Sequence, residues 1–487
     1  MKPEFDNPDL FSFDDSFASL YHLGTIKKKV INVARKDFEE YRVFAREHLR
    51  PLALAADLRA QKDKNSLADD MLALAVKHKM LTRMIPQFLG GTGSGVMWGL
   101  NPGIEELASV DPCYNGGVIA GHGLGFVALS MTMNMERMEW VAEQTVKGEQ
   151  EGKPFLIDCA ITEPMAGTDY EEVDLLPRAR LMSSAKRVNG GAVLNGSKCF
   201  ISSGHLANYH LLIMPYDIND PVNSNGMFLV ANDAPGFNLG RIEDKMGMKA
   251  GAASELVFKD CFVPEQNILY SYDDFSESYA EELVMAVLGI TRITVGAVGT
   301  GIARGAFEHA LSFAKNHKWK GKTIIHQQWA QERLTNMLMN VYTARNAYLE
   351  ASYVLYTTLM PGHMPGFMNT DIVRKMYNNS IAKRLRYTKM ARKAMLKTIK
   401  SMPENEKQRL QFYSSMAKVV GTDIGMQNCH SAMEMMGEYG LRHDVGMEKL
   451  FRDAKLCQIF EGTNQLNRLN MFKYFIGRNI PDVKVFG

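Results

Sequence analysis

The spacing of apolar residues divides the chain into three stretches. Up to about residue 150 apolar residues recur with a helical period, as over 67–80, and a Gly-rich loop at 85–95 interrupts them. From about 276 the helical spacing returns. Between them the pattern predicts a β domain, because short apolar or alternating runs are separated by Gly, Asn, Asp and Pro; these runs are 155–161, 209–214, 227–230 and 255–263. We therefore expect a helical domain over 1–154, a β domain over 155–275 and a second helical domain over 276–487.

Two apolar stripes run through the second helical domain. One stripe follows a single face of a predicted long helix and consists of Leu334, Met337, Val341, Ala344 and Tyr348. The other is made of small residues, namely Ala303, Ala306, Ala310 and Ala314. Stripes of this kind must be covered by other helices, so we expect helix-on-helix packing here.

A basic run interrupts this helical region. The stretch 374–400 carries ten Lys or Arg residues and no Asp or Glu. Such a run is typical of a solvated helix face, and its second interpretation is a surface for an anionic partner.

Composition and charge exclude several classes of protein. With 487 residues, 46% hydrophobic and 23% charged, the chain has the profile of a folded globular protein, and its net charge of +2 gives no overall argument for nucleic acid or an anionic membrane. The six cysteines are scattered without metal-ligand spacing, so we expect no metal site and no disulfide framework. The acidic start, 1–10, lacks the features of a signal peptide, and no apolar run approaches the ~20 residues that span a bilayer. These features favour a cytoplasmic location.

Two turn-like segments carry candidate chemistry in the β domain. Residues 161–169 read Ile-Thr-Glu-Pro-Met-Ala-Gly-Thr-Asp and combine a rigid proline and a glycine with hydroxyl side chains, which suits an anionic or carbonyl-rich ligand. Residues 194–204 read Leu-Asn-Gly-Ser-Lys-Cys-Phe-Ile-Ser-Ser-Gly and predict a hairpin turn followed by a strand. Taken singly, each is equally well an ordinary surface turn.

Together with a third segment they resemble a known family. Near the C-terminus stand Arg-Asp-Ala-Lys at 452–455 and Ile-Phe-Glu-Gly-Thr-Asn-Gln at 459–465, followed by Leu-Asn-Arg at 466–468. The order and spacing of these motifs, with Gly-Ile-Ala-Arg-Gly-Ala at 301–306, resemble the acyl-CoA dehydrogenase family from about residue 40 to 478. The resemblance implies an α+β multidomain fold: an N-terminal all-α domain, a middle β-barrel and a C-terminal four-helix domain.

The resemblance also implies a reaction. Oxidising an acyl-CoA thioester to the trans-2-enoyl-CoA takes a weakly acidic α proton while the β carbon gives a hydride to N5 of FAD, so it needs a carboxylate shielded from water. Glu461 matches the family's catalytic base and stands beside Gly462. Some members place the base on a helix that aligns with 288–292, where this chain has no acid. Members lacking both acids carry out non-redox elimination, and Glu461 argues against that chemistry here.

The family's binding residues carry over position by position. For FAD the resemblance implies Thr162 at the pyrimidine end of the ring system, Ser202 near N5 and Phe200 packed beside the ring, with Thr463 and Gln465 at the phosphate and adenosine portion. The remaining expected cofactor contacts are Cys159, Ala160, Ile161, Gly167, Thr168, Ile201, His317 and Gln328. For the substrate it implies Thr168 and Arg292 along the pantetheine channel, together with Thr291 and Gly462.

Three positions depart from the family pattern. His317 stands where an Arg usually reaches the FAD pyrophosphate of a neighbouring subunit, and Glu434, with Gly437-Glu438, stands where a Gln usually touches the adenosine. The stretch 357–412 is several tens of residues longer than in typical members and contains the basic run.

The expected partners also follow from the resemblance. They are an acyl-CoA from fatty or other carboxylic acid degradation, an electron acceptor such as electron-transfer flavoprotein, and further copies of the chain in a homotetramer or homodimer. Three rival functions stay open at this point: an acyl-CoA oxidase, a CoA-thioester lyase, and a flavin-containing nucleic-acid-binding relative, the last suggested only by 374–400.

Overall fold

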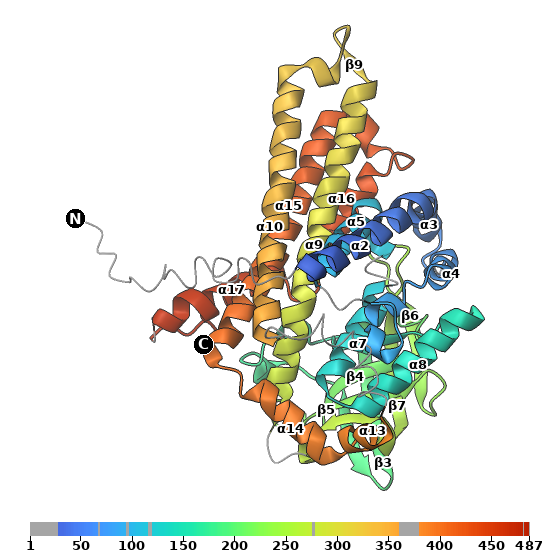
Figure 1. The fold of residues 1–487 in the computed structure, drawn as a ribbon, viewed down its shortest axis with the longest axis vertical. Helices are drawn as coiled ribbons and strands as arrows, with labels where there is room; N and C mark the ends of the chain where they lie inside the picture. The colour runs from blue at the N-terminus through green and yellow to red at the C-terminus, as the bar shows by residue number, and fades with distance from the viewer. Residues whose placement is uncertain are drawn as a thin grey trace, which may run out of the picture.

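The computed structural model describes residues 28–66, 69–93, 97–114, 119–274, 278–359, 379–480 and 482–486. Several sequence expectations therefore fall partly outside the described residues: the N-terminal stretch 1–10, the first two residues of the helix expected over 67–80, the end of the loop at 85–95, and 374–378 of the basic run. Within the described part the chain forms helices, then a β domain, then helices, as expected (Figure 1).

The N-terminal region is helical. Pro51 stands at the start of α3, and the side chain of Asn134 caps α8 by accepting a hydrogen bond from the backbone N–H of Arg137 at 3.2 Å. The helices of this region are α2 (Lys28–Val43), α3 (Arg50–Lys62), α4 (Asp69–Lys77), α5 (Met97–Val110), α6 (Pro112–Tyr114), α7 (Ala120–Met131) and α8 (Met135–Glu151).

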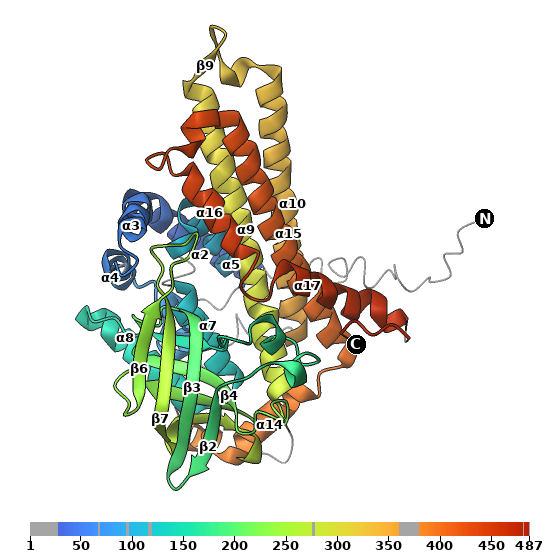
Figure 2. The same ribbon diagram turned by 180° about the vertical axis from the view of Figure 1, so that it is seen from behind.

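The β domain, expected as a β-barrel, consists of two four-stranded sheets. One sheet has the order β1-β4-β5-β8 and the other β2-β3-β7-β6, seen in Figure 2. Leu212 and Phe228 of the first sheet share a buried core with Leu256 and Phe258 of the second. The strands are β1 (Ile157–Ala160), β2 (Ser184–Val188), β3 (Gly191–Ser202), β4 (Tyr209–Pro215), β5 (Asn225–Ala231), β6 (Phe237–Ile242), β7 (Ala253–Pro264) and β8 (Ile268–Ser271).

The hairpin turn expected at Asn195-Gly196 is wrong. The two-residue turn between β2 and β3 uses the preceding Asn189-Gly190, because Val188 pairs with Gly191 and Gly190 has a φ of +80°. Gly196, with a φ of +125°, instead lies inside β3, where the register with β7 shifts. One Asn-Gly pair therefore turns the chain, and the other makes a β-bulge.

The C-terminal region is built around long helices. The two predicted apolar stripes lie on α9 and α10, and every residue of both is buried, so the expected helix packing is confirmed. Helices α9 and α15 approach so closely that a Cβ on Gly299 would lie 2.4 Å from the carbonyl carbon of Gly421. The helices are α9 (Ala280–Asn316), α10 (Gln328–Leu359), α13 (Ser380–Arg386), α14 (Lys389–Lys400), α15 (Glu404–Met436), α16 (Met447–Cys457) and α17 (Asn464–Met471).

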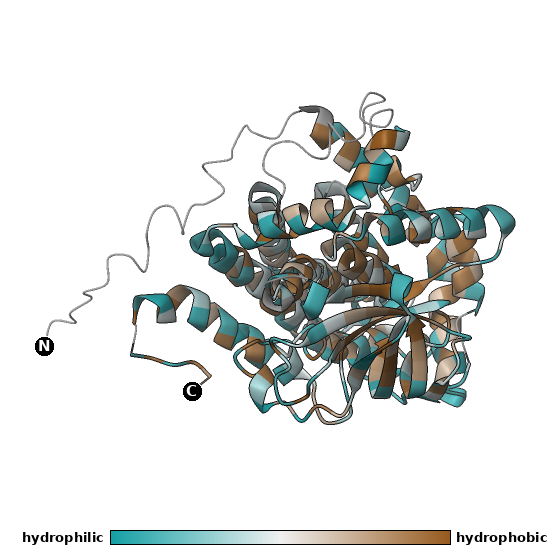
Figure 3. Cartoon of the chain, turned by 90° about the horizontal axis from the view of Figure 1, so that it is seen from below, coloured by the Kyte–Doolittle hydropathy of each residue, from teal (hydrophilic) through white to brown (hydrophobic). Residues whose placement is uncertain are grey.

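Helix α9 is the central element of the molecule. It runs from the β domain to a small hairpin of β9 (Lys318–Trp319) and β10 (Lys322–Thr323) at the far end (Figures 1 and 2). Among the described residues it is the one helix long and apolar enough to cross a membrane, but 72% of its most apolar window is buried inside the structure. In Figure 3 apolar residues gather where helices and strands meet. We interpret α9 as a core helix.

Candidate active site

The turn between α16 and α17 has an unusual backbone. Glu461 has a φ of +58° and Gly462 a φ of +75°, so two consecutive residues adopt the left-handed conformation. For a glutamate this conformation is strained, and strain of this kind is concentrated at functional sites. Gly462 is required here, because a Cβ would lie 2.9 Å from Oε2 of Glu171 and 3.1 Å from Nη2 of Arg292.

Three buried side chains hold this turn in place through its carbonyl groups. Arg292 Nε donates to the carbonyl of Glu461 at 3.1 Å. Lys418 Nζ donates to the carbonyl of Gly462 at 2.8 Å, and so does Asn467 Nδ2 at the same distance. Burial lowers the pKa of Lys418 to about 8. The positive φ angles are therefore fixed by surrounding charges and amides rather than by the local sequence.

The carboxylate of Glu461 faces α9. The hydroxyl of Thr291 donates to Glu461 Oε2 at 2.6 Å. Burial raises the pKa of the Glu461 carboxyl above its ordinary value, and the Thr291 hydrogen bond and the positive charges of Arg292 and Lys418 oppose this effect. Glu461 as a whole residue is half-buried. The result is a partly shielded carboxylate of raised basicity that a ligand can reach.

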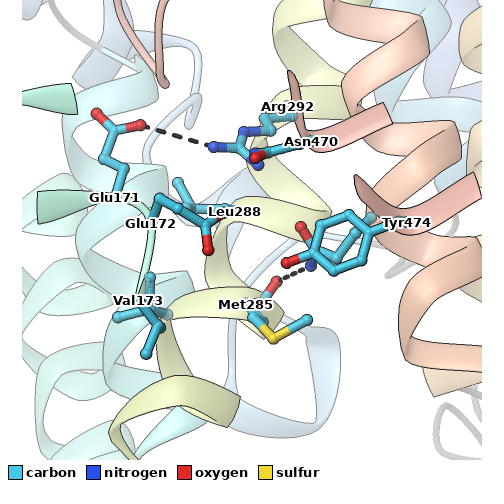
Figure 4. A pocket seen from close by; sticks show the side chains of 10 residues that line it. Glu171, Glu172, Val173, Met285, Leu288, Arg292, Asn470 and Tyr474 are labelled. Atoms are coloured by element: carbon cyan, nitrogen blue, oxygen red, sulfur yellow. Dashed lines mark hydrogen bonds and ion pairs between the residues drawn. The ribbon is translucent and has the colours of Figure 1, made fainter. Parts of the chain in front are cut away.

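A second carboxylate lies on the other side of Arg292 (Figure 4). Glu171 Oε2 stands 3.7 Å from Arg292 Nη2, and neither atom makes a hydrogen bond with the described residues. Burial raises the pKa of Glu171 to about 7, with Arg292 acting against the shift and Glu461 adding to it. Arg292 itself is only 1% exposed. It therefore connects the strained turn to the segment that follows residues 161–169.

Two cavities adjoin this part of α9. One is polar and lies between the 171–173 segment, α9, α15 and the C-terminal helices; its polar lining consists of Glu171, Glu172, Arg292, Gln411, Asn470 and Tyr474 (Figure 4). The other is apolar and includes Ile161, Met227, Tyr270 and Val287. Val284 and Leu288 line both. The segment 161–173 and the turn at 461–463 thus approach α9 from two directions.

A buried ion pair fixes the 161–166 segment to β3. Lys198 Nζ lies 2.8 Å from Glu163 Oε1 and donates to the carbonyl of Ile161 at 2.8 Å, and both charged side chains are fully buried. The backbone N–H of Cys199 donates to the carbonyl of Thr162 at 2.9 Å. The two motifs of the β domain, about thirty residues apart in sequence, are therefore one structural unit.

The bulge at Cys199-Phe200 directs an aromatic ring outward. Phe200 has a φ of +58° and is 58% exposed, although β3 around it is part of the core. The hydroxyls of Thr162 and Ser202 make no hydrogen bond with the described residues. An exposed ring on the bulge, with available hydroxyl groups on Ser202 of the same strand and on Thr162 of the segment bonded to it, fits the edge of a flat, polar ring system such as a flavin.

The structure separates the other expected cofactor residues into two groups. The side chains of Cys159, Ala160 and Ile201 belong to the hydrophobic core, so they leave only their backbone for a ligand. Gly167 and Thr168 lie where the segment enters the short turn that leads to Glu171, with the N–H of Gly167 donating to Asp169 at 2.8 Å.

The expected FAD contacts in the C-terminal region lie at two places: Thr463 and Gln465 directly follow the Glu461 turn, whereas His317 and Gln328 lie elsewhere. Thr463 caps α17 by accepting a hydrogen bond from the N–H of Leu466 at 3.2 Å, whereas Gln465 is exposed. His317 and Gln328 stand at the β9 end of α9 and α10, far from the β domain (Figure 1). His317 stacks on Phe313 with ring centroids 4.0 Å apart, and Glu434 pairs with Arg333 at 3.0 Å.

The sequence interpretation missed several residues of this site. Lys198 and Glu163 were part of the quoted motifs, but no role was assigned to them. Lys418 and Asn467 hold the Glu461 turn, and Glu171 faces Arg292. Sequence reasoning could have found the Lys198–Glu163 pair, because an acid and a lysine stand in two motifs that were assigned to one site. Lys418 lies on a long helix without any such signal.

Comparison with known proteins identifies the family. The family model described as acyl-CoA dehydrogenase, middle domain, matches residues 159–261, and that described as acyl-CoA dehydrogenase, C-terminal domain, matches 282–363 and 367–474. Together these matches cover more than half of the chain.

Individual relatives agree with the family models. A cyclohexane-1-carbonyl-CoA dehydrogenase of Geobacter metallireducens is 26% identical over 432 residues, which are 88% of this chain and 94% of the relative. An acyl-CoA dehydrogenase of Bacillus subtilis is 26% identical over 437 residues, 90% of this chain and 96% of the relative. The solved structure of butyryl-CoA dehydrogenase from Megasphaera elsdenii has a TM-score of 0.69 and 23% identity, covering 91% of this chain and 98% of that one. The expected fold is confirmed by this likeness.

Proposed function

Since the chain belongs to the acyl-CoA dehydrogenase family, a family of flavoprotein oxidoreductases, we propose that it oxidises an acyl-CoA thioester to the trans-2-enoyl-CoA with FAD as its cofactor. The observation that carries this proposal is the Glu461 carboxylate, which is basic, partly accessible and held in a strained turn against Thr291.

Glu461 is the proposed base for the α proton. A carboxylate in water is too weak a base for this proton, and the burial that raises the pKa of Glu461 supplies part of the difference. The backbone N–H groups of Glu461 and Gly462 donate to no acceptor among the described residues. They are available to the thioester oxygen, where they would stabilise the negative charge that develops as the α proton leaves.

The flavin would lie against the exposed ring of Phe200. Thr162 and Ser202 offer their hydroxyl groups beside it, and the Lys198–Glu163 pair keeps the segment that carries Thr162 in position. When bound, FAD supplies the acceptor for the hydride of the β carbon. The residues of this chain would orient the ring and exclude water from the base.

The polar cavity suits the amide groups of the pantetheine arm. Arg292 Nη2, Glu171 Oε2 and Asn470 Oδ1 are buried atoms without a hydrogen bond among the described residues. An arm with both donors and acceptors would satisfy them. Thr168 stands three residues before Glu171, so the proposed channel runs from Thr168 past Arg292 to Gly462.

Four further assignments belong to the same proposal. The electron acceptor is a protein carrier such as electron-transfer flavoprotein, the assembly is a homotetramer or homodimer, and the location is the cytoplasm. The oligomer is supported by the position of His317 and Gln328 at the β9 end of α9 and α10, which is the end away from the β domain that carries Phe200 (Figure 1). The proposed domain limits are 1–154, 155–275 and 276–487.

The test is a screen of acyl-CoA esters for anaerobic flavin bleaching. Straight-chain, branched, alicyclic and aromatic esters are added to the purified flavoprotein, and the products are identified by mass spectrometry. We expect at least one ester to bleach the flavin and to yield an enoyl-CoA. Oxygen consumption with hydrogen peroxide formation would instead identify an oxidase, and product without flavin reduction would identify a lyase. The molar mass of the protein, measured by light scattering, tests the proposed assembly.

A further inference from the structure

Helices α13 and α14 form one strip along the outside of the β domain. Both views place them at the lower edge of the molecule beside the strands (Figures 1 and 2). They contain most of the basic run, in which residues 379–400 include no Asp or Glu. The sequence alone favours a solvated face for this run. In the structure, one side of the two helices contacts the protein and the other side is exposed.

The inner side of the strip is anchored to the protein. Arg386 Nη2 and Lys383 Nζ lie 2.6 Å and 3.1 Å from the two carboxylate oxygens of Glu139 on α8. Lys389 Nζ lies 2.8 Å from Asp274 Oδ1. Glu139 is only 7% exposed, so the contacts of Arg386 and Lys383 are made to a partly desolvated carboxylate, whereas the side chain of Lys389 is 76% exposed and its pair with Asp274 lies at the surface.

Two further contacts continue the anchorage along α14. Arg392 Nε donates to the carbonyl of Thr132 at 2.8 Å, and Leu396, 1% exposed, belongs to the hydrophobic core of the β domain. The orientation of the strip is therefore fixed over its whole length, and its other side must face away from the protein.

The outer side combines large apolar residues with cations. Ile381, Leu385 and Met390 are 69%, 61% and 81% exposed. Apart from Lys389, which pairs with Asp274, the exposed basic residues between and beyond them are Arg384, Lys393 and Lys397. We call these six residues the outer face. Ile381, Arg384 and Leu385 follow one another at helical spacing, so the apolar and basic side chains share one surface.

We propose that the outer face binds the surface of an anionic lipid membrane. Aliphatic side chains beside lysines and arginines, without any acid, are the arrangement with which amphipathic helices lie in a membrane interface: the apolar groups enter the acyl boundary and the cations meet lipid phosphates. Lysine and arginine can also place their alkyl chains against lipid while their charges stay at the headgroups. The inference is independent of the proposed function.

The composition of the outer face favours lipid over nucleic acid. Bases stack on aromatic side chains, but Tyr387, the aromatic residue of this strip, donates its hydroxyl to Glu139. Phosphate contacts alone would account for the three cations and leave three exposed aliphatic side chains unexplained. A second copy of this chain has the same basic strip and would bring like charges together.

The test is co-sedimentation of the flavin-loaded full chain with vesicles. Phosphatidylcholine vesicles containing about one third phosphatidylserine are compared with pure phosphatidylcholine vesicles. We expect binding to the anionic vesicles only, and loss of most of it in about 0.5 M salt, where charges are screened. An equal distribution between the two vesicle types, or a protein that stays in the supernatant with both, would overturn the proposal.

Two variants separate the contributions of the outer face. Ile381→Ser/Leu385→Ser/Met390→Ser removes the apolar part and should weaken vesicle binding at least about tenfold, because three side chains that enter the acyl boundary are lost. Arg384→Gln/Lys393→Gln/Lys397→Gln removes the charge and should also weaken binding at least about tenfold, because three cations at about one kcal/mol each exceed the 1.4 kcal/mol of a tenfold change. The matched controls are Met182→Ser/Leu441→Ser, whose apolar side chains are each 61% exposed, and Lys186→Gln/Lys259→Gln. Far-ultraviolet circular dichroism reports folding of all variants.

Three outcomes of the variants would contradict a lipid surface. The first is an equal loss of binding in the control variants. The second is a change in the oligomer mass of the Ile381→Ser/Leu385→Ser/Met390→Ser variant, which would identify the face as a contact between copies. The third is tight retention of duplex DNA by the parent protein that disappears in the charge variant, which would identify a nucleic-acid surface.

Discussion

The hydroxyl oxygen of Thr291 on α9 lies 2.6 Å from Oε2 of Glu461, in the turn before α17. The same hydroxyl is also 3.1 Å from the carbonyl of Val287, one turn earlier on the helix. Its single proton cannot serve both acceptors, and the shorter contact with a charged group takes it. The helix thereby stabilises the ionised form of the carboxyl whose pKa burial raises.

Replacing Thr291 by Val should move the pH dependence of the reaction. Loss of a hydrogen bond to a charged group raises the pKa of Glu461 further, because that bond favours the ionised form, and the active form is the carboxylate. The acid limb of kcat/KM should therefore shift to higher pH, with activity recovering in alkaline buffer. Thr291→Ser keeps the hydroxyl and is the control. An unchanged acid limb in the Val variant would mean that this contact does not tune the base.

Glu171 should make the stability of the protein depend on pH. Its pKa in the folded state is raised to about 7 from an ordinary value of 4.5, and its side chain is only 16% exposed. The folded state therefore holds the proton more strongly, and this stabilisation is present below pH 4.5 and is lost as pH rises towards 7.

Glu171→Gln removes this dependence. The free energy of unfolding of the variant relative to the parent should rise between pH 4.5 and 7, by up to about 3 kcal/mol. Urea unfolding across this range gives the difference directly. A constant difference at all pH values would show that Glu171 titrates normally.

Lys198 should be essential for the stability of the β domain. Lys198→Met leaves the fully buried carboxylate of Glu163 without its cation, and breaking such a pair costs about 3–5 kcal/mol. We expect this loss in urea unfolding, together with release of flavin on gel filtration. Lys198→Met/Glu163→Gln should recover part of the stability because no charge is left buried. Lys186→Met, at an exposed position of β2, is the matched control and should change little.

Phe200 should act through packing on the cofactor. Phe200→Trp keeps a flat ring and should change the rate of substrate oxidation by no more than about tenfold, which corresponds to roughly 1.4 kcal/mol of barrier. Phe200→Ala should weaken FAD binding and slow reoxidation by a protein carrier more than reduction by substrate. Stopped-flow measurements separate the two half-reactions. Normal flavin affinity and normal rates in the Ala variant would place the flavin elsewhere.

Sequence reasoning was most successful where apolar residues recur at a regular spacing within one element. The alanine stripe of α9 and the mixed apolar stripe of α10 could be predicted directly, because apolar residues at helical spacing form one face, and such a face is buried in a folded protein. The four predicted apolar runs coincide with β1, β4, β5 and β7 for the same reason. The expectation at Asn195-Gly196 was wrong because two Asn-Gly pairs stand six residues apart, one just before β3 and one inside it, and only cross-strand pairing decides which of them turns the chain.

The supporting residues of the site could not be predicted in this way. Lys418 and Asn467 matter through carbonyl groups 44 and five residues away in sequence, and a lone lysine on a helix has the same appearance whether it is buried or solvated. Similarly, the basic run is divided between two roles: Lys383 and Arg386 contact the buried carboxylate of Glu139, whereas Arg384 and Lys397 are exposed. Which basic residues contact a carboxylate depends on the residues that the fold brings next to them, and these are distant in sequence.

The most direct test of the central claim compares the parent protein with Glu461→Gln in anaerobic flavin bleaching. The amide preserves the shape of the side chain and removes the base, so the variant should keep its flavin and still bind the acyl-CoA that bleaches the parent, as the shift of the flavin spectrum on mixing shows. Its bleaching rate should fall at least about a hundredfold, the lower end of what a general base contributes. Bleaching at the rate of the parent would contradict the assignment of Glu461 as the base.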